Sequence, residues 1–300
     1  MESTLTRRAR NWVALRVQIA AEAAEAVGEV MRSNAPSGLI EEPGARKDTV
    51  ALTGFFATKR EADEAAGAVQ ERLRLWGRSA ASDFSATQRK VRAADWQREW
   101  RKSWSAFEAA PGLIIKPTWS RRKTRPGEVV VELYPGAAFG TGEHATTLQC
   151  LRAVKRYLRP GWQVLDVGTG SAILAIAAAK LGASRVVAVD NDIRALRCAR
   201  ENVERNGARG EVFLIASHLL SATRFCADLL TANLTAELLQ ELAGSARRAL
   251  RRGGIFVAAG ITTEKATALE RSFSPRGLAI IERADERGWT TFACRLGNRA

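Results

Sequence analysis

The chain has 300 residues, 46% of them hydrophobic and 26% charged, which is enough for one large or two ordinary domains with a buried core. Its formal charge of +14 favours attraction to nucleic acid or another polyanion but predicts no fold. Four widely spaced cysteines and only two histidines argue against a zinc site, a disulfide scaffold and a catalytic metal, and no apolar stretch is long enough to span a membrane, so we expect a cytoplasmic protein.

The first ninety residues read as alternating strands and helices. Val13, Leu15, Val17 and Ile19 alternate with polar residues or alanine, which is typical of a strand with one buried face. The helix-like "AEAAEAVGEVMRS", the strand-like "DTVALTGFFAT" and the amphipathic "KREADEAAGAVQERLRLW" follow. This order predicts a small α+β domain of the ferredoxin-like kind over residues 1–93.

A tryptophan-rich segment comes next, and we expect residues 94–128 to link two domains. Trp96, Trp100 and Trp104 recur every four residues, so on a helix they would share one face. Such a face would dock one domain on the other, with a substrate groove as the alternative. The charged "RRKTRPG" predicts an exposed loop.

From Val129 onward, apolar strands alternate with helices. The near-continuous apolar "WQVLDVG" is typical of a buried parallel strand, and "SRVVAVDND", "ADLLTANLT" and "GIFVAAGI" repeat the pattern with helical segments between them. This alternation predicts an α/β fold with a doubly wound parallel sheet over residues 129–300. The tail "GLAIIERADERGWTTFACRL" predicts two strands that add an antiparallel edge.

A glycine-rich turn follows the first of these strands. Gly168 and Gly170 allow a tight turn and close approach of a ligand. A dinucleotide-binding turn would need glycine at position 173, which is Ile173, so the spacing argues against NAD. A D-x-G-x-G turn favours S-adenosylmethionine instead.

Two polar residues end neighbouring strands. Asp190 lies about twenty residues beyond the glycines, where a carboxylate can accept hydrogen bonds from both ribose hydroxyls. Asp192 is the better candidate for the N-cap of the next helix, and Asp166 is placed to orient the glycine turn. Asn233 should face the cleft, where its carbonyl oxygen can hold an attacking amine; a turn-forming asparagine is the alternative.

The combination of "FGTGEHATT", "VLDVGTGS", "AVDND", "ENVERNG" and "ANL" with the upstream "DWQREW" and "KPTWS" resembles the methyltransferase family that modifies large-subunit ribosomal protein eleven. The resemblance covers nearly the whole chain, and "FGTGxHxTT" is its most specific motif. It implies a Rossmann-like class I methyltransferase fold, with the small first domain recognising the substrate protein.

The resemblance also implies that Thr147, Gly168, Asp190 and Asn233 bind S-adenosylmethionine, beside Gly170 of the same turn, and that the "FGTGEHATT" loop covers the methionine end. His144 is then a structural residue of that loop. The chain departs from the family pattern at Ala172, where a third glycine is usual, and in "ANLT", where the family has "ANIL".

We therefore expect methyl transfer to amines of the ribosomal protein, at lysine side chains and the N-terminus, with Asn233 as the catalytic residue. No general base is evident, and no feature predicts an oligomeric state. A lysine methyltransferase of another protein, such as the electron-transfer flavoprotein β-subunit, stays open. An RNA methyltransferase would suit the charge, but "NLT" lacks the proline and aromatic residue of adenine-modifying enzymes. A binding module without turnover is the last alternative.

Overall fold

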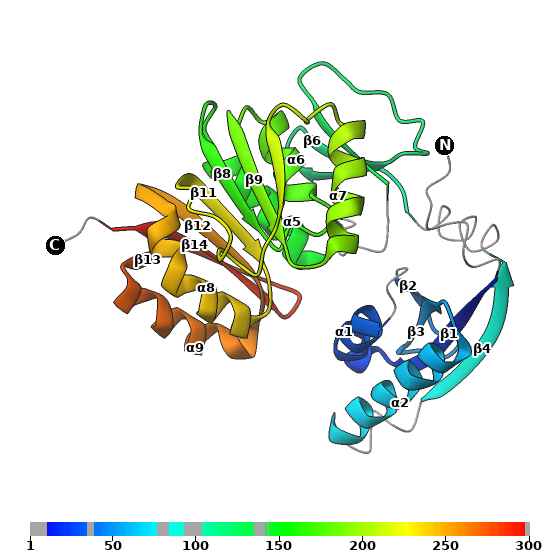
Figure 1. The fold of residues 1–300 in the computed structure, drawn as a ribbon. Coiled ribbons are helices and arrows are strands. Elements are labelled where there is room, and N and C mark those ends of the chain that lie inside the picture. Colours follow the sequence, from blue (N-terminus) through cyan, green and yellow to red (C-terminus); the bar gives the residue numbers. More distant parts are fainter. Residues whose placement is uncertain are drawn as a thin grey trace. The chain divides into compact units, whose positions relative to one another are not determined.

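The computed structural model describes residues 11–34, 39–76, 84–92, 104–134, 142 and 144–297. It divides the chain into two compact units, Met1–Ser105 and Ala106–Ala300 (Figure 1). We expected a linker over 94–128, whereas the structure assigns residues 106–128 to the second unit. Trp96 and Trp100 lie outside the described residues. In the described part of the chain, no helix is long and apolar enough to cross a membrane.

In its described residues, the first unit is a four-stranded antiparallel sheet with two α-helices. Its strands stand in the order β2-β3-β1-β4. The elements along the chain are β1 (Asn11–Ala20), a 3-10 turn (Ala21–Ala23), α1 (Ala24–Asn34), β2 (Leu39–Pro43), β3 (Thr49–Phe56), α2 (Lys59–Trp76) and β4 (Ser85–Arg92). Leu15, Val17 and Ile19 are fully buried against both helices, as their alternation predicts.

The second unit is built on a seven-stranded sheet with the order β10-β9-β8-β11-β12-β14-β13 (Figure 1). Its strands are β8 (Gln163–Val167), β9 (Arg185–Asp190), β10 (Val212–Ala216), β11 (Ala227–Asn233), β12 (Leu250–Thr262), β13 (Leu278–Glu286) and β14 (Trp289–Leu296). Strands β8 to β12 pair in parallel, and the hairpin of β13 and β14 pairs antiparallel with β12.

Helices cover both faces of this sheet. They are α5 (Ala145–Tyr157), α6 (Ile173–Lys180), α7 (Ile193–Arg205), α8 (Ala236–Ala249) and α9 (Thr263–Phe273), the last followed by a 3-10 turn (Ser274–Arg276). The chain winds outward from β8 to β9 and β10, then in the opposite direction from β11 to β12. Since such crossovers are right-handed, α6 and α7 lie on one face, while α8 and α9 lie on the other (Figure 1). The order reverses between β8 and β11, which is where α/β sheets bind ligands.

A small sheet of β5 (Phe107–Ala110), β6 (Leu113–Pro117) and β7 (Val129–Leu133) belongs to the same unit. Two buried or half-buried amides of α7 hold β7 in place. The side chain of Asn206 accepts from Glu132 N at 2.9 Å and donates to Glu132 O at 2.6 Å. Asn202 accepts from Tyr134 N at 2.8 Å and donates to Ser171 O at 3.0 Å, which ties the strand to the glycine turn.

Candidate functional site

The turn between β8 and α6 uses its backbone N–H groups internally. Gly168 N and Thr169 N both donate to Val189 O, at 2.9 and 3.0 Å. Gly170 N donates to the Asp190 carboxylate at 2.9 Å. No N–H from 168 to 170 is therefore left to cradle a phosphate, which is what a pyrophosphate-binding turn supplies.

Gly168 could not be replaced without disturbing this turn. Its φ is +72°, and an added Cβ would lie 2.4 Å from Leu234 Cδ2, at the end of the neighbouring strand β11. Ala172, where the family pattern has glycine, also adopts a left-handed conformation, with φ +64°, and begins α6 without a side-chain cap. The alanine therefore keeps the backbone shape of a glycine at that position, at the energetic cost that a Cβ brings there.

Asp190 ends β9 and is half-buried, with one backbone donor on each carboxylate oxygen. Gly170 N bonds to Oδ2 and Asp192 N to Oδ1, both at 2.9 Å. The remaining lone pairs of the two oxygens can still accept from a ligand. Asp192 caps α7 by accepting from Arg194 N at 2.8 Å, which confirms that capping falls to Asp192 and leaves Asp190 available.

Asp166 lies beneath the turn and is completely buried. Its two oxygens accept from Thr169 Oγ1 and Thr231 Oγ1, both at 2.7 Å. Burial raises the pKa of Asp166 from its ordinary 3.8 to about 6; the two threonine hydrogen bonds act against this rise, and the charge of Asp190 adds to it. Asp166 thus fixes the turn to β11 and orients it, as its position in the sequence predicts.

The Asp166→Asn variant is expected to lose a pH dependence of stability. Because the pKa of the folded carboxyl is raised, its contribution is full below the unfolded pKa of about 4 and is lost as the pH rises through about 6, a change on the order of 2–3 kcal/mol. Asparagine cannot titrate, so urea unfolding should show the stability of the variant, relative to the parent, rising between about pH 4 and about pH 7. Parallel pH profiles for the two proteins would contradict this.

Asn233 and Thr147 meet across the site although 86 positions separate them. Asn233 Nδ2, at the end of β11, donates to Thr147 Oγ1 in the first turn of α5 at 3.3 Å. Thr147 is buried and Asn233 half-buried. Gly260 supports the pair, since an added Cβ there would lie 2.3 Å from Leu234 O and 3.0 Å from Asn233 Oδ1.

The start of α5 is held by residues that we did not predict. Gln149 donates to Ala284 O and accepts from Thr291 Oγ1, at 3.3 and 2.7 Å, which fixes the helix to the β13–β14 hairpin. The Trp289 ring meets the His144 ring edge-on at 5.1 Å. Trp289 Nε1 is buried and has no hydrogen-bond partner in the described residues. In the sequence, Trp289 was marked only as the last residue of the late "ERGW".

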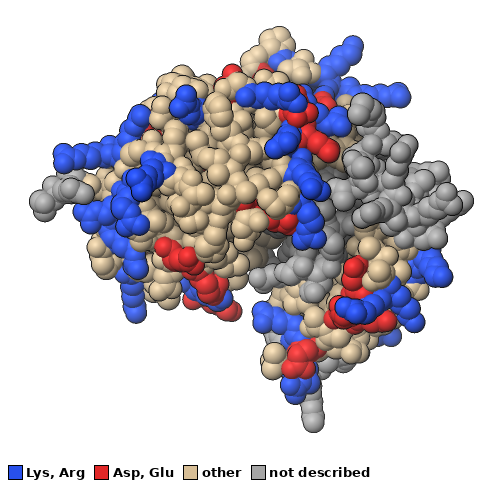
Figure 2. All heavy atoms as spheres, viewed as in Figure 1, with Lys and Arg blue, Asp and Glu red and all other residues tan. Residues whose placement is uncertain are grey.

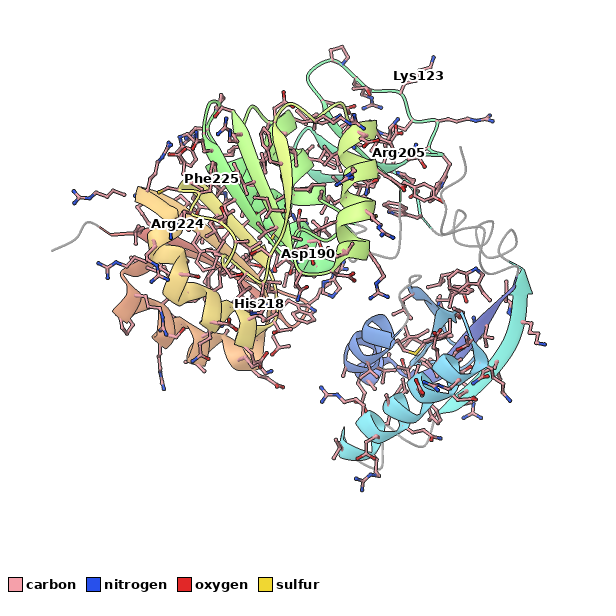
Figure 3. The ribbon with its side chains drawn as sticks, viewed as in Figure 1. Lys123, Asp190, Arg205, His218, Arg224 and Phe225 are labelled. Atoms are coloured by element: carbon pink, nitrogen blue, oxygen red, sulfur yellow. The ribbon has the colours of Figure 1, made fainter. Side chains whose placement is uncertain are left out.

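Neither histidine is arranged as a catalytic base. His144 caps α5 by accepting from Thr146 N, which supports its structural interpretation. His218 is exposed and lies 3.1 Å from Glu241. Asp190 and His218 nevertheless lie at the same edge of the sheet (Figure 3). Residues 139–141 and 143 of the "FGTGEHATT" loop lie outside the described residues, whereas Gly142 and residues 144–147 are described; no metal-ligand cluster occurs among the side chains described.

A strand order that reverses beside a glycine turn whose N–H groups are already used is the arrangement expected of an α/β methyltransferase rather than of a pyrophosphate-binding enzyme. Comparison with known proteins makes this specific. The profile of the ribosomal protein L11 methyltransferases (PrmA) matches residues 11–296, and the chain belongs to that family. The resemblance seen in the sequence is thereby confirmed.

Individual proteins that are similar to this chain carry the same family name. The ribosomal protein L11 methyltransferase of Pelotomaculum thermopropionicum is 45% identical over 69% of this chain and 68% of its own length. The ribosomal protein L11 methyltransferase of Staphylococcus carnosus is 29% identical over 96% of this chain and 99% of its own length. The crystal structure of the ribosomal protein L11 methylase from Lactobacillus delbrueckii subsp. bulgaricus superimposes with a TM-score of 0.61 at 30% identity, covering 65% of this chain and all of the other.

Proposed function

We propose that this enzyme transfers methyl groups from S-adenosylmethionine to amines of ribosomal protein L11, at lysine side chains and the N-terminal amine. Family membership supports the reaction and the substrate. The observation that carries the cofactor is the Asp190 carboxylate, which has lone pairs to spare beside a turn whose N–H groups are already used. A ribose diol suits such a carboxylate, and a pyrophosphate does not suit such a turn.

Five residues would hold the cofactor. Asp190 accepts from the ribose hydroxyls, while Gly168 and Gly170 admit the ligand close to the backbone. Thr147, in the first turn of α5, and Asn233, at the end of β11, meet where the methionine part would be bound. When bound, the sulfonium supplies an activated methyl group with a good leaving group.

The protein then has to place the amine and keep it neutral. The Asn233 amide, fixed through Thr147, offers its carbonyl oxygen to the acceptor amine and aligns its lone pair. An ammonium has no lone pair, so the amine must first lose its proton. Desolvation in the site lowers the pKa of an amine and favours the reactive form. The proton passes to solvent water before the transfer, so the proposed step uses no dedicated base.

The first unit would recognise the substrate. Its strand order, with β1 and β3 at the centre, supports a ferredoxin-like arrangement. We propose that the domain over residues 1–93 binds ribosomal protein L11, that the tryptophan-rich segment joins it to the catalytic unit, and that the reaction takes place in the cytoplasm.

The proposed function is tested by intact mass. The protein is incubated with S-adenosylmethionine and ribosomal protein L11 of the same organism. We expect mass gains in whole methyl steps that peptide mapping assigns to lysines and the N-terminus. A substrate with an acetylated N-terminus separates the two kinds of amine. No gain, in a preparation that binds the cofactor, would contradict the substrate assignment and make RNA the next candidate.

A further inference from the structure

Arginines gather at the amino edge of the large sheet. Since β8 to β12 are parallel, they all begin at the edge opposite Asp190 and Asn233. We call the following exposed residues, which precede or begin these strands or end α7 and α8, the amino-edge arginines: Arg159, Arg185, Arg205, Arg209, Arg224, Arg247, Arg248, Arg251 and Arg252. Arg224 and Arg205 lie at the end of the unit away from Asp190 (Figure 3).

The charge of this edge is poorly balanced. Arg251 pairs with Asp228 at 3.0 Å and Arg209 pairs with Glu204, but the other seven amino-edge arginines form no ion pair with a described residue. Two further acidic residues lie at this edge: Glu211, and Glu132, which contacts Asn206 and pairs with Lys116 at 3.0 Å. Blue side chains project from the side of the second unit that carries the starts of β8, β11 and β12, with little red between them (Figure 2). Unpaired guanidinium groups at this density attract a polyanion.

Aromatic rings lie beside these cations. Phe213, in β10 at the edge of the sheet, is 45% exposed and is one of four exposed large hydrophobic residues in the described part of the chain. The Arg185 guanidinium lies 5.4 Å from the centre of its ring. Arg205 lies at the same distance from the ring of Tyr134. An exposed ring next to arginines is a platform on which an unpaired base can stack.

We propose that the amino edge binds single-stranded RNA. Beside Lys180 at the end of α6, the exposed cations by which we define this edge are the nine arginines, whose planar fork matches a phosphate with two hydrogen bonds and stacks on bases, which lysine does not do. Phosphates would contact the unpaired guanidinium groups, and a base would stack on Phe213. Because the methyl-transfer site occupies the opposite edge, RNA and the protein substrate can be bound together.

The test compares two variants with the same loss of charge. Arg247→Gln, Arg248→Gln and Arg252→Gln are combined in one protein. The control combines Lys59→Gln, Arg89→Gln and Lys90→Gln, exposed cations of the first unit without an ion pair in the described residues. Fluorescence anisotropy with a labelled oligouridylate should show that the first variant binds at least about tenfold more weakly than the parent. Its plot of log affinity against log salt concentration should have a slope smaller by about 2. The control should stay close to the parent.

Phe213→Ala adds a second readout. It removes no charge, so we expect weaker RNA binding, by about fivefold or more, with an unchanged salt slope. The amino-edge triple variant and Phe213→Ala should keep the melting temperature and the L11 methylation of the parent, which separates this inference from the proposed function. The control variant lies in the unit proposed to bind L11, so it is compared by RNA binding and melting temperature alone. Equal losses in both triple variants would reduce the effect to net charge and overturn the proposal. So would a parent that binds phosphatidylserine vesicles but not the oligonucleotide.

Discussion

Replacing Asp190 with alanine is expected to weaken the binding of S-adenosylmethionine by about a hundredfold. The carboxylate would lose two charge-assisted hydrogen bonds to the ribose, together worth about 3 kcal/mol. In the parent, the two carboxylate oxygens accept hydrogen bonds from Gly170 N and Asp192 N. The variant loses these bonds too, so the glycine turn also loses its support. Calorimetric titration with the cofactor measures the effect directly, without any need for the protein substrate.

Asp192 provides a matched control only two positions away. Asp192→Ala removes the cap of α7, which should lower the free energy of unfolding by about 1 kcal/mol and leave cofactor affinity unchanged. Asp190→Asn should fall between the parent and the alanine variant, since an amide keeps only one acceptor oxygen. If Asp190→Ala bound the cofactor as tightly as the parent, or if Asp192→Ala lost as much affinity, the ribose assignment would be wrong.

The parallel strands of the second unit could be predicted because a strand that is buried on both faces has a nearly continuous apolar sequence. In β8, Val164, Leu165 and Val167 are all buried, and β9 runs from Val186 to Val189 without exposure. The position of Asp190 follows from this. Once two neighbouring parallel strands are recognised, the residue that ends the second must lie beside the turn that follows the first.

Other elements have no recognisable pattern in the sequence. Residues 85–90 of β4 are exposed, so the strand shows no alternation and pairing with β1 alone defines it. Helix α5 begins directly after a glycine-rich loop, and we read the segment as part of that loop although Leu151 and Val154 have helical spacing. Strands β5 and β6 were hidden in the predicted linker because strands this short resemble any apolar stretch between turns.

The contacts within the site depend on tertiary structure. Gly168 faces Leu234, and Asn233 faces Thr147, across strands and helices that are distant in sequence. A single sequence can indicate that each residue is unusual where it stands, but it carries no sign of which partner it meets. The role of His144 as a cap was similarly visible only when α5 was seen to begin at Ala145.

Asn233→Ala should lower kcat by a hundredfold or more while changing cofactor affinity much less. The reason is that, in the proposed mechanism, the amide oxygen positions the attacking amine, and removal of one preorganised polar group from a reacting centre has effects of roughly that size. Single-turnover methylation of ribosomal protein L11 gives the rate, and cofactor titration gives the affinity. Thr235→Ala, an exposed residue just beyond β11, should leave both unchanged.

Variants of Thr147 test whether the orientation of the Asn233 amide matters for the reaction. Thr147→Val removes the acceptor of the Asn233 amide, so the amide can rotate, and we expect kcat to fall by about tenfold; Thr147→Ser keeps the hydroxyl and should restore most of it. In the double variant Asn233→Ala with Thr147→Val, the valine should add little, because its partner is already gone. Fully additive losses would show that Thr147 acts on the reaction independently, and the hydrogen bond between the two side chains would then have no part in placing the amine.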